Sequence, residues 1–387
     1  MRVKTGIEAL LYEQDALLRG RRIGLATNPT GVLPDLTSDI AALLHYPGAY
    51  LVALFGPEHG IAANIQDGLA VSSSIHTESG LPVYSLYGAT RKPTAEMLQS
   101  IDLLIFDMQD VGCRFYTYLY TLSYLMEAAA EHDVPILVLD RPNPLGGVII
   151  EGNLLDPAYA SFVGRYPMPI RYGLTIGEFA LYINREYHIN AELTVVPMRG
   201  WRRDMWFDQT GLLWVPPSPN MPTLETATVY PGMCLVEGTN LSEGRGTCKP
   251  FEMVGAPWIN GQSLAAALNA LQLPGVRFRP ADFAPTYGKF SGKWCSGVQV
   301  HVTDRQAFHP VATGLHVLAT IKAMYPRHFA WLSSSWEGQP PHFDLLMGGD
   351  HVRRRLDVGN SVAEIIGEWG QSLAAFRKAC AAYFLYE

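Results

Sequence analysis

The sequence predicts an α/β protein that has an open parallel sheet in its first part and a smaller α+β domain in its last part. Two observations support this fold class. Short apolar runs alternate with helix-like segments through the first half of the chain, and the pattern becomes mixed after Ile259. At 387 residues the chain also exceeds one typical domain, so we expect two domains, residues 1–260 and 261–387.

The parallel sheet is predicted from four near-continuous apolar runs that have the length of strands buried on both faces. These runs are residues 22–27, 50–55, 102–107 and 135–140. Between the third and the fourth run, apolar side chains from residue 118 to residue 129 recur at helical spacing. A helix in this position is what a crossover between two parallel strands requires.

The later elements are predicted from capping, proline content and periodicity. Thr175–Glu178 has the S/T-x-x-E form of a capping box, so a helix is expected to begin there. Residues 214–222 contain too many prolines for a helix or a central strand, and we expect a long ordered loop over residues 201–257. In the last domain we expect helices near 263–271, 311–324 and 362–383 and a strand near 298–302.

Composition disfavours several classes of protein. Hydrophobic residues make up 48% of the chain and charged residues 17%, which favours a large core over disorder. The net charge of -7 and the lack of a long Lys/Arg cluster disfavour nucleic-acid binding. Five scattered cysteines suit free thiols in a reducing compartment, and neither a signal-like N-terminus nor an 18-residue apolar run is visible. We therefore expect a cytoplasmic protein without membrane insertion, and the sequence leaves its oligomeric state open.

Polar residues follow all four predicted strands. The carboxyl ends of parallel strands lie at one edge of a sheet, which is where ligands bind in open α/β folds. We therefore expect these side chains to gather on one rim, and they are Thr27 and Asn28, Glu58 and His59, Gln109 and Asp110, and Arg141 and Asn143.

The first dense group of candidate catalytic residues is the short segment Gly56–Gly60. Glu58 lies between Pro57 and His59, and the flanking glycines allow the backbone to approach a ligand closely. A partly enclosed glutamate can serve as a general acid. The alternative is that Glu58 only stabilises a turn.

The second group is the loop Glu237–Thr247, which carries Glu237, Asn240, Glu243 and Arg245. Its glycines do not have the spacing of a phosphate-binding loop, so recognition of a polar sugar fits better. The alternative is a structural loop in which Arg245 pairs with Glu243 or Glu237.

Two further strand ends offer candidates. Asp110 could be the second carboxylate or a ligand for a hydroxyl group, and Arg141 with Asn143 could bind an acidic substituent. The alternative for Arg141 is a buried ion pair with Asp140. We expect no metal site, because the histidines and aspartates of residues 342–351 lie in a mixed apolar segment, and we expect no cofactor.

Many motifs of this chain resemble those of the NamZ-type exo-β-N-acetylmuramidases, and they occur in the order found in that family over most of the chain. They are GPEHG (56–60), SLYG with KPT (85–94), FDMQDVGCRFYTY (106–118), LDRPNPLGG (139–147), EG (151–152), SPNMPT (218–223), YPG (230–232) and EGTNLSEGRGT with PFE (237–252). Three positions depart from the pattern: Tyr172 replaces a histidine, Cys248 replaces a threonine, and residues 71–76 are less acidic.

The resemblance implies a Rossmann-like sheet with helices on both faces, a smaller C-terminal domain, and release of terminal N-acetylmuramic acid from the non-reducing end of peptidoglycan fragments. It implies that Glu58 is the main catalytic glutamate, and it places His59, Arg141, Asn143, Glu237, Asn240 and Arg245 in family motifs. We expect these residues, together with Asn28 on the rim, to bind the substrate, a muropeptide or another peptidoglycan-derived saccharide. The second catalytic group is then Asp110, Glu243 or the 2-acetamido oxygen of the substrate. Two other functions stay open: a saccharide-binding protein without turnover, and an amide or ester hydrolase acting on the same fragments.

Overall fold

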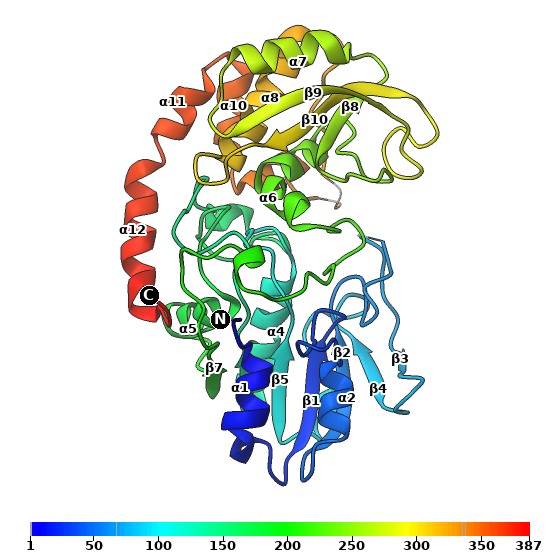
Figure 1. The fold of residues 1–387 in the computed structure, drawn as a ribbon, viewed down its shortest axis with the longest axis vertical. Helices are drawn as coiled ribbons and strands as arrows, with labels where there is room; N and C mark the ends of the chain where they lie inside the picture. The colour runs from blue at the N-terminus through cyan, green and yellow to red at the C-terminus, as the bar shows by residue number, and fades with distance from the viewer. Residues whose placement is uncertain (1, 67, 335, 337) are drawn as a thin grey trace.

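The structure, a computed structural model, describes residues 2–66, 68–334, 336 and 338–387 (Figure 1). Within these residues, a seven-stranded sheet has the strand order β3-β4-β2-β1-β5-β6-β7. All neighbouring strands are parallel except β3 and β4. The strands are β1 (Arg22–Thr27), β2 (Tyr50–Gly56), β3 (Ser74–Ile75), β4 (Pro82–Ser85), β5 (Leu103–Asp107), β6 (Ile136–Leu139) and β7 (Leu193–Val196).

The prediction of an open parallel sheet is confirmed, with one short antiparallel strand added at its edge. Without β3 the order of the parallel strands is that of a doubly wound Rossmann-like sheet, in which the order of successive strands along the sheet reverses between β1 and β5. The five residues of β5 are all buried, which explains why this strand reads as an unbroken apolar run.

Helices cover both faces of the sheet because successive strand residues point to opposite sides. Leu103 and Ile105 belong to a core cluster with residues of α1 (Gly6–Glu13) and α2 (Asp39–Leu44). Leu104 and Phe106 belong to a second cluster with residues of α4 (Tyr118–Glu131) and α5 (Ile176–Glu186). The predicted crossover helix is α4, and the predicted capping box of Thr175 and Glu178 begins α5.

The C-terminal part contains a three-stranded antiparallel sheet in the order β8 (Met253–Ala256), β10 (Cys295–Val302), β9 (Val276–Phe283). The expected domain boundary at residue 260 stays a prediction, and β8, which precedes it, pairs with β10. The remaining helices are α3 (Ala95–Leu98), α6 (Leu224–Met233), α7 (Gly261–Ala270), α8 (Pro310–Met324), α9 (His342–Met347), α10 (His351–Asp357), α11 (Val362–Gly367) and α12 (Gly370–Cys380), with 3-10 turns η1 (Asp15–Leu17), η2 (Pro157–Tyr159), η3 (Phe207–Gln209), η4 (Cys234–Gly238) and η5 (Ala381–Tyr383).

The expectation of an uninterrupted loop over residues 201–257 is wrong, because α6 lies within it. The Thr223 hydroxyl caps this helix by accepting a hydrogen bond from the amide of Thr226. Residues 226–233 are all buried, so the segment has no polar face to produce a helical pattern. Gly232 of α6 and Gly314 of α8 pack backbone against backbone, since a Cβ on Gly232 would lie 1.8 Å from the Pro310 carbonyl oxygen.

Buried polar contacts join the part of the chain around the large sheet to the C-terminal part. The Glu151 carboxylate accepts a hydrogen bond of 2.8 Å from the amide of Ala312 in the first turn of α8. The Arg114 guanidinium donates to the carbonyls of Leu346 and Met347 at the end of α9. After α12 the chain returns to the large sheet, where the hydroxyl of Tyr386 donates to Asp140 (Figure 1).

Candidate active site

A cavity of about 520 Å³ lies where the carboxyl rim of the large sheet meets the C-terminal part. From the sheet side it is lined by Glu58 and His59, which follow β2, and by Thr117 at the start of α4. The C-terminal side contributes segments that are far apart in the sequence. Their lining residues include Asn220, Glu237, Glu243, Arg245, Lys289 and His342.

A tight turn after β2 brings Glu58 and His59 to the cavity. The amide of Gly60 donates to the carbonyl of Pro57 over 3.0 Å, and His59 and Gly60 both have positive φ, 71° and 77°. A positive φ is uncommon for a residue other than glycine and often marks a functional site. The motif Gly56–Gly60 therefore forms a backbone turn that directs two adjacent side chains to one wall.

Both carboxylate oxygens of Glu58 are held by hydrogen bonds. Oε2 accepts a bond of 2.7 Å from the Thr117 hydroxyl, and Oε1 accepts one of 3.1 Å from the amide of Gly68. Glu58 is 8% exposed, so its carboxyl group is enclosed yet reaches the cavity. The structure thus places Glu58 as a fixed carboxyl group on a cavity wall, as its position at the end of a strand suggested.

The ring of His59 is oriented by a backbone carbonyl. Its Nδ1 lies 2.8 Å from the carbonyl oxygen of Ile65. Because a carbonyl oxygen only accepts hydrogen bonds, Nδ1 carries a proton, and in the neutral ring Nε2 is then an acceptor.

The loop Glu237–Thr247 also lines the cavity, and its charged side chains form an ion-pair cluster. The Arg245 Nε lies 3.0 Å from Glu237 Oε1 and 3.5 Å from Glu243 Oε1, and His342 Nε2 lies 3.5 Å from Glu237 Oε2. Burial alone would raise the pKa of Glu237, but the Arg245 charge and the contact with His342 outweigh it and lower that pKa. Glu237 is therefore ionised, and the pairing of Arg245 with Glu237 expected as an alternative is present.

Glu243 is held between this loop and the C-terminal sheet. Its Oε2 lies 3.0 Å from Nζ of Lys289, a residue between β9 and β10. The preceding residue, Ser242, forms a two-way backbone bridge with Gly255 of β8. Glu243 is 5% exposed and lines the same cavity as Glu58.

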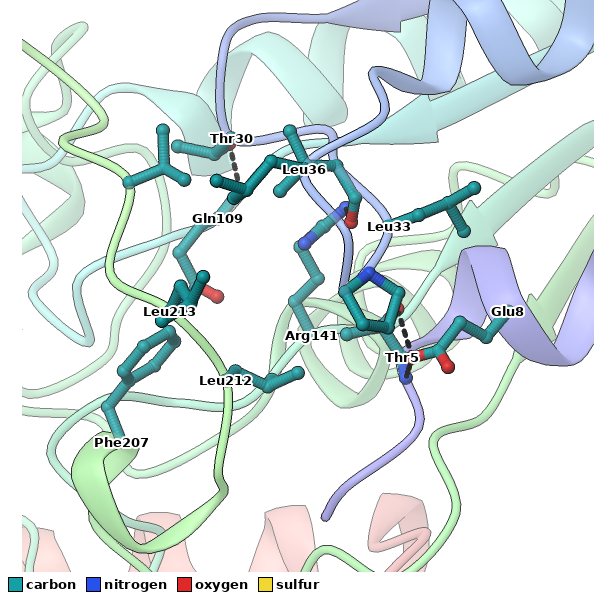
Figure 2. Close-up of a pocket in the computed structure, with 13 residues that line it drawn as sticks. Thr5, Glu8, Thr30, Leu33, Leu36, Gln109, Arg141, Phe207, Leu212 and Leu213 are labelled. Atoms are coloured by element: carbon teal, nitrogen blue, oxygen red, sulfur yellow. Dashed lines mark hydrogen bonds between the residues drawn. The ribbon is translucent and has the colours of Figure 1, made fainter.

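Arg141 lies outside this cavity, in a second pocket of about 30 Å³ that has room for about one water molecule. Figure 2 shows its side chain between Gln109 on one side and Thr5 and Glu8 on the other. Its guanidinium pairs with Asp107 in two hydrogen bonds of 2.5 and 2.9 Å. The alternative of an ion pair with Asp140 is wrong, because the guanidinium binds Asp107, the last residue of the neighbouring strand β5.

Asp110 also lies behind the cavity wall. It accepts a hydrogen bond of 2.6 Å from the amide of Gly112 and another from the hydroxyl of Tyr172. Burial raises the pKa of Asp110 to about 6, against the opposing effect of these two bonds. Tyr172, one of the three departures from the family pattern, is thus the partner of a candidate carboxylate.

Three predicted site residues, all asparagines, bond to protein backbone and do not line the large cavity as the structure describes it. The Asn28 side chain accepts from the amide of Thr30, and that of Asn143 donates to the carbonyl of Leu174. The Asn240 side chain donates to the carbonyl of His328. Each of these asparagines shapes a loop, and their substrate-binding roles stay predictions.

Several residues at the cavity were not predicted as site residues, and Thr117, Lys289 and His342 are among them. Thr117 lies in the motif at 106–118 and before a predicted helix but was not selected as a candidate, and Lys289 is a single lysine in a loop. His342 was considered only as a metal ligand. Among the residues that the structure describes, no group of three or more histidine, cysteine, aspartate or glutamate side chains is arranged to hold a metal ion.

All five cysteines have free thiols. Within the described part of the chain, no helix combines the length and the apolar character needed to cross a bilayer.

Comparisons with known proteins match this chain along its length. The family model described as Exo-beta-N-acetylmuramidase NamZ, N-terminal, matches residues 23–225, and the corresponding C-terminal model matches residues 228–386. The chain is 52% identical over 385 residues to the peptidoglycan beta-N-acetylmuramidase NamZ of Bacillus subtilis (strain 168), which covers 100% of this chain and 92% of the relative.

Two crystal structures of DUF1343 family proteins from Bacteroides fragilis NCTC 9343 have a similar fold. One has a TM-score of 0.91 and 41% sequence identity, and the other a TM-score of 0.79 and 30% identity. Each comparison covers 100% of this chain and 99% of the other.

Proposed function

The chain belongs to the exo-β-N-acetylmuramidase NamZ family and is by this homology a glycosidase, and on that premise we propose that Glu58 is its general acid. In this proposal the enzyme releases terminal N-acetylmuramic acid from the non-reducing end of peptidoglycan fragments. Glu58 protonates the glycosidic oxygen while positive charge develops at the muramic acid ring.

The observation that carries the proposal is the fixed place of the Glu58 carboxyl group on the cavity wall. The hydroxyl of Thr117 both donates and accepts hydrogen bonds, so it can stay in contact with Glu58 before and after proton transfer. The amide of Gly68 holds the other oxygen. A general acid held in this way needs little reorganisation when the glycosidic bond breaks.

Glu243 is our choice for the second carboxylate. It lines the cavity that Glu58 lines, whereas Asp110 bonds to Tyr172 and Gly112 behind the wall. Lys289 Nζ lies 3.0 Å from one of its carboxylate oxygens, and Arg245 Nε lies 3.5 Å from the other. In this proposal Glu243 either acts as the nucleophile or base, or stabilises a cation while the 2-acetamido oxygen attacks.

Arg245 is our choice for the cation that recognises the lactyl carboxylate of muramic acid. It lines the cavity of about 520 Å³, and its guanidinium, which already contacts Glu237 and Glu243, is a group that binds carboxylates well. Arg141, the other candidate, has its guanidinium paired with Asp107 and faces a pocket of about 30 Å³.

The test is the product formed from a disaccharide that has N-acetylmuramic acid at its non-reducing end. We expect free N-acetylmuramic acid by mass spectrometry, and no release from a disaccharide that has N-acetylglucosamine in that place. Binding without turnover would identify a saccharide-binding protein. With a peptide-substituted muramyl disaccharide, release of the peptide without muramic acid would identify an amide hydrolase, and either result would overturn the proposal.

A further inference from the structure

We propose that Lys289 is a positioning residue for this reaction, and that its ammonium group is the built-in cation of an oxygen cage that holds Glu243 in place. The inference rests on the proposed function at one point, which is that Glu243 lies beside the reacting sugar. It assigns to the C-terminal sheet a part in building the catalytic centre.

The cage consists of four backbone carbonyl oxygens and one carboxylate oxygen. Lys289 Nζ lies 3.2 Å from the oxygen of Val236, 3.1 Å from that of Glu237, 2.8 Å from that of Thr239 and 2.9 Å from that of Leu241. Glu243 Oε2 lies 3.0 Å from the same nitrogen.

The backbone of this loop creates the need for a cation. Val236 and Glu237 lie at the end of the 3-10 turn η4, where backbone carbonyls run out of helical partners, although the Val236 carbonyl also accepts from the amide and the hydroxyl of Thr239. Thr239 and Leu241 follow in a chain reversal that turns their carbonyls toward the same point. Without a donor there, converging carbonyl dipoles and the Glu243 charge would repel one another.

A lysine suits this place better than an arginine, because its ammonium is a compact point charge on a flexible stem. An ammonium has three protons, and here they are shared among the four carbonyl oxygens, while the Glu243 oxygen is in ion-pair contact with the same nitrogen. The donors of Lys289 are therefore committed to the protein and not to the sugar, so Lys289 acts through Glu243.

The segment that carries Lys289 also holds the loop by its backbone. The amide and the hydroxyl of Thr286 both donate to the carbonyl of Gly246, over 2.9 and 3.0 Å. A Cβ on Gly246 would lie 2.7 Å from the amide nitrogen of Tyr287, so glycine is required for this close approach. The hydroxyl of Tyr287 donates to the side chain of Asn220 on the cavity wall.

The experiment is chemical rescue of Lys289→Ala. This substitution removes the atoms of a propylammonium ion, so added propylammonium can refill the cage. We expect kcat to fall about 10- to 100-fold, as is typical when a residue that orients an active-site group is removed, while KM changes less. Propylammonium should restore kcat with saturation and raise the melting temperature, because a ligand that binds the folded state stabilises it.

Controls separate a specific cation from salt and from folding. Propanol and tetramethylammonium chloride at matched ionic strength should not rescue, and Lys293→Ala, an exposed lysine in the same segment, should keep wild-type kcat. Should Lys289→Ala give no soluble protein, Lys289→Gln takes its place. That variant keeps most of the stem without the charge, and we again expect kcat at least about tenfold lower.

Wild-type kcat in Lys289→Ala or Lys289→Gln would overturn the proposal, and so would the lack of any effect of propylammonium on both kcat and the melting temperature. If the wild-type protein itself releases no muramic acid, the proposed function fails instead. The dependence of the melting temperature on propylammonium still tests the cage in that case.

Discussion

Replacing Thr117 by valine tests how Glu58 is held. Valine keeps the shape of the side chain and removes the hydroxyl that donates to Glu58 Oε2 over 2.7 Å. Thr117 precedes α4, yet its hydroxyl makes no capping bond to that helix, so the substitution removes no helix cap. The change is therefore aimed at the carboxyl group and not at the fold.

The expected loss follows from the charge that develops on Glu58. As Glu58 gives up its proton it becomes a carboxylate, so the bond from Thr117 strengthens in the transition state and its removal lowers kcat more than it raises KM. A hydrogen bond to a charged group contributes about 1.5–3 kcal/mol, which corresponds to a loss in kcat of about 10- to 150-fold.

The assay is the rate of muramic acid release at saturating disaccharide, together with a thermal melt. Thr121→Val is the matched control, since Thr121 lies one turn later in α4 and its hydroxyl bonds to the backbone carbonyl of Thr117. It should keep kcat within about threefold of wild type, and both variants should melt within about 4 °C of wild type. Wild-type kcat in Thr117→Val, or an equal loss in both variants, would refute the reasoning.

Four further substitutions test the second carboxylate, the lactyl-binding cation and a buried acid. Glu243→Gln should lower kcat at least about 100-fold, whereas Asp110→Asn should lower it less than about tenfold. The reason is that, of these two carboxylates, Glu243 lines the cavity and Asp110 does not. Measuring kcat for both variants decides which carboxylate acts. Arg245→Met should raise KM about tenfold or more for a muramyl disaccharide. It should not raise KM for the analogue whose lactyl carboxylate is an amide. An equal effect on both substrates would contradict the role of Arg245. Burial raises the pKa of Glu151 from 4.5 to about 7. Between these two pH values the folded protein keeps a proton that the unfolded chain loses. The free energy of unfolding therefore falls by up to about 3 kcal/mol as pH rises from 4.5 to 7. Glu151→Gln should therefore show a smaller drop in melting temperature between pH 5 and pH 8 than wild type, by calorimetry, and an unchanged drop would exclude this group as its source.

Much of the large sheet could be predicted because its central strands are buried on both faces and its helices carry local signals. The run at 22–27 coincides with β1, and the capping box at Thr175 begins α5. Helix α6 could not be predicted in this way, since burial on all sides removes the amphipathic pattern and Pro231 near its end suggests a loop. Strand β8 could not be predicted for a different reason. It has only four residues, and its partner strand, β10, lies in a distant segment of the sequence.

The candidate site was predictable only in part, and the reason is geometric. A glutamate between glycines after a strand indicated Glu58, because strand ends meet at one rim. The same argument also selected Arg141, but side-chain direction at a rim depends on neighbours, and here Asp107 binds the guanidinium. Lys289 and Thr117 could not be found, since their roles come from contacts that span 46 and 59 positions in the sequence, to Glu243 and Glu58.

The most direct test of Glu58 as the general acid compares two leaving groups in wild type and Glu58→Gln. One substrate is the muramyl disaccharide, whose sugar leaving group needs a proton, and the other is 4-nitrophenyl N-acetylmuramide, whose leaving group departs without one. We predict that Glu58→Gln loses at least about 100-fold in kcat on the disaccharide and less than about tenfold on the nitrophenyl glycoside. An equal loss on both substrates, or undiminished turnover of the disaccharide, would contradict the account.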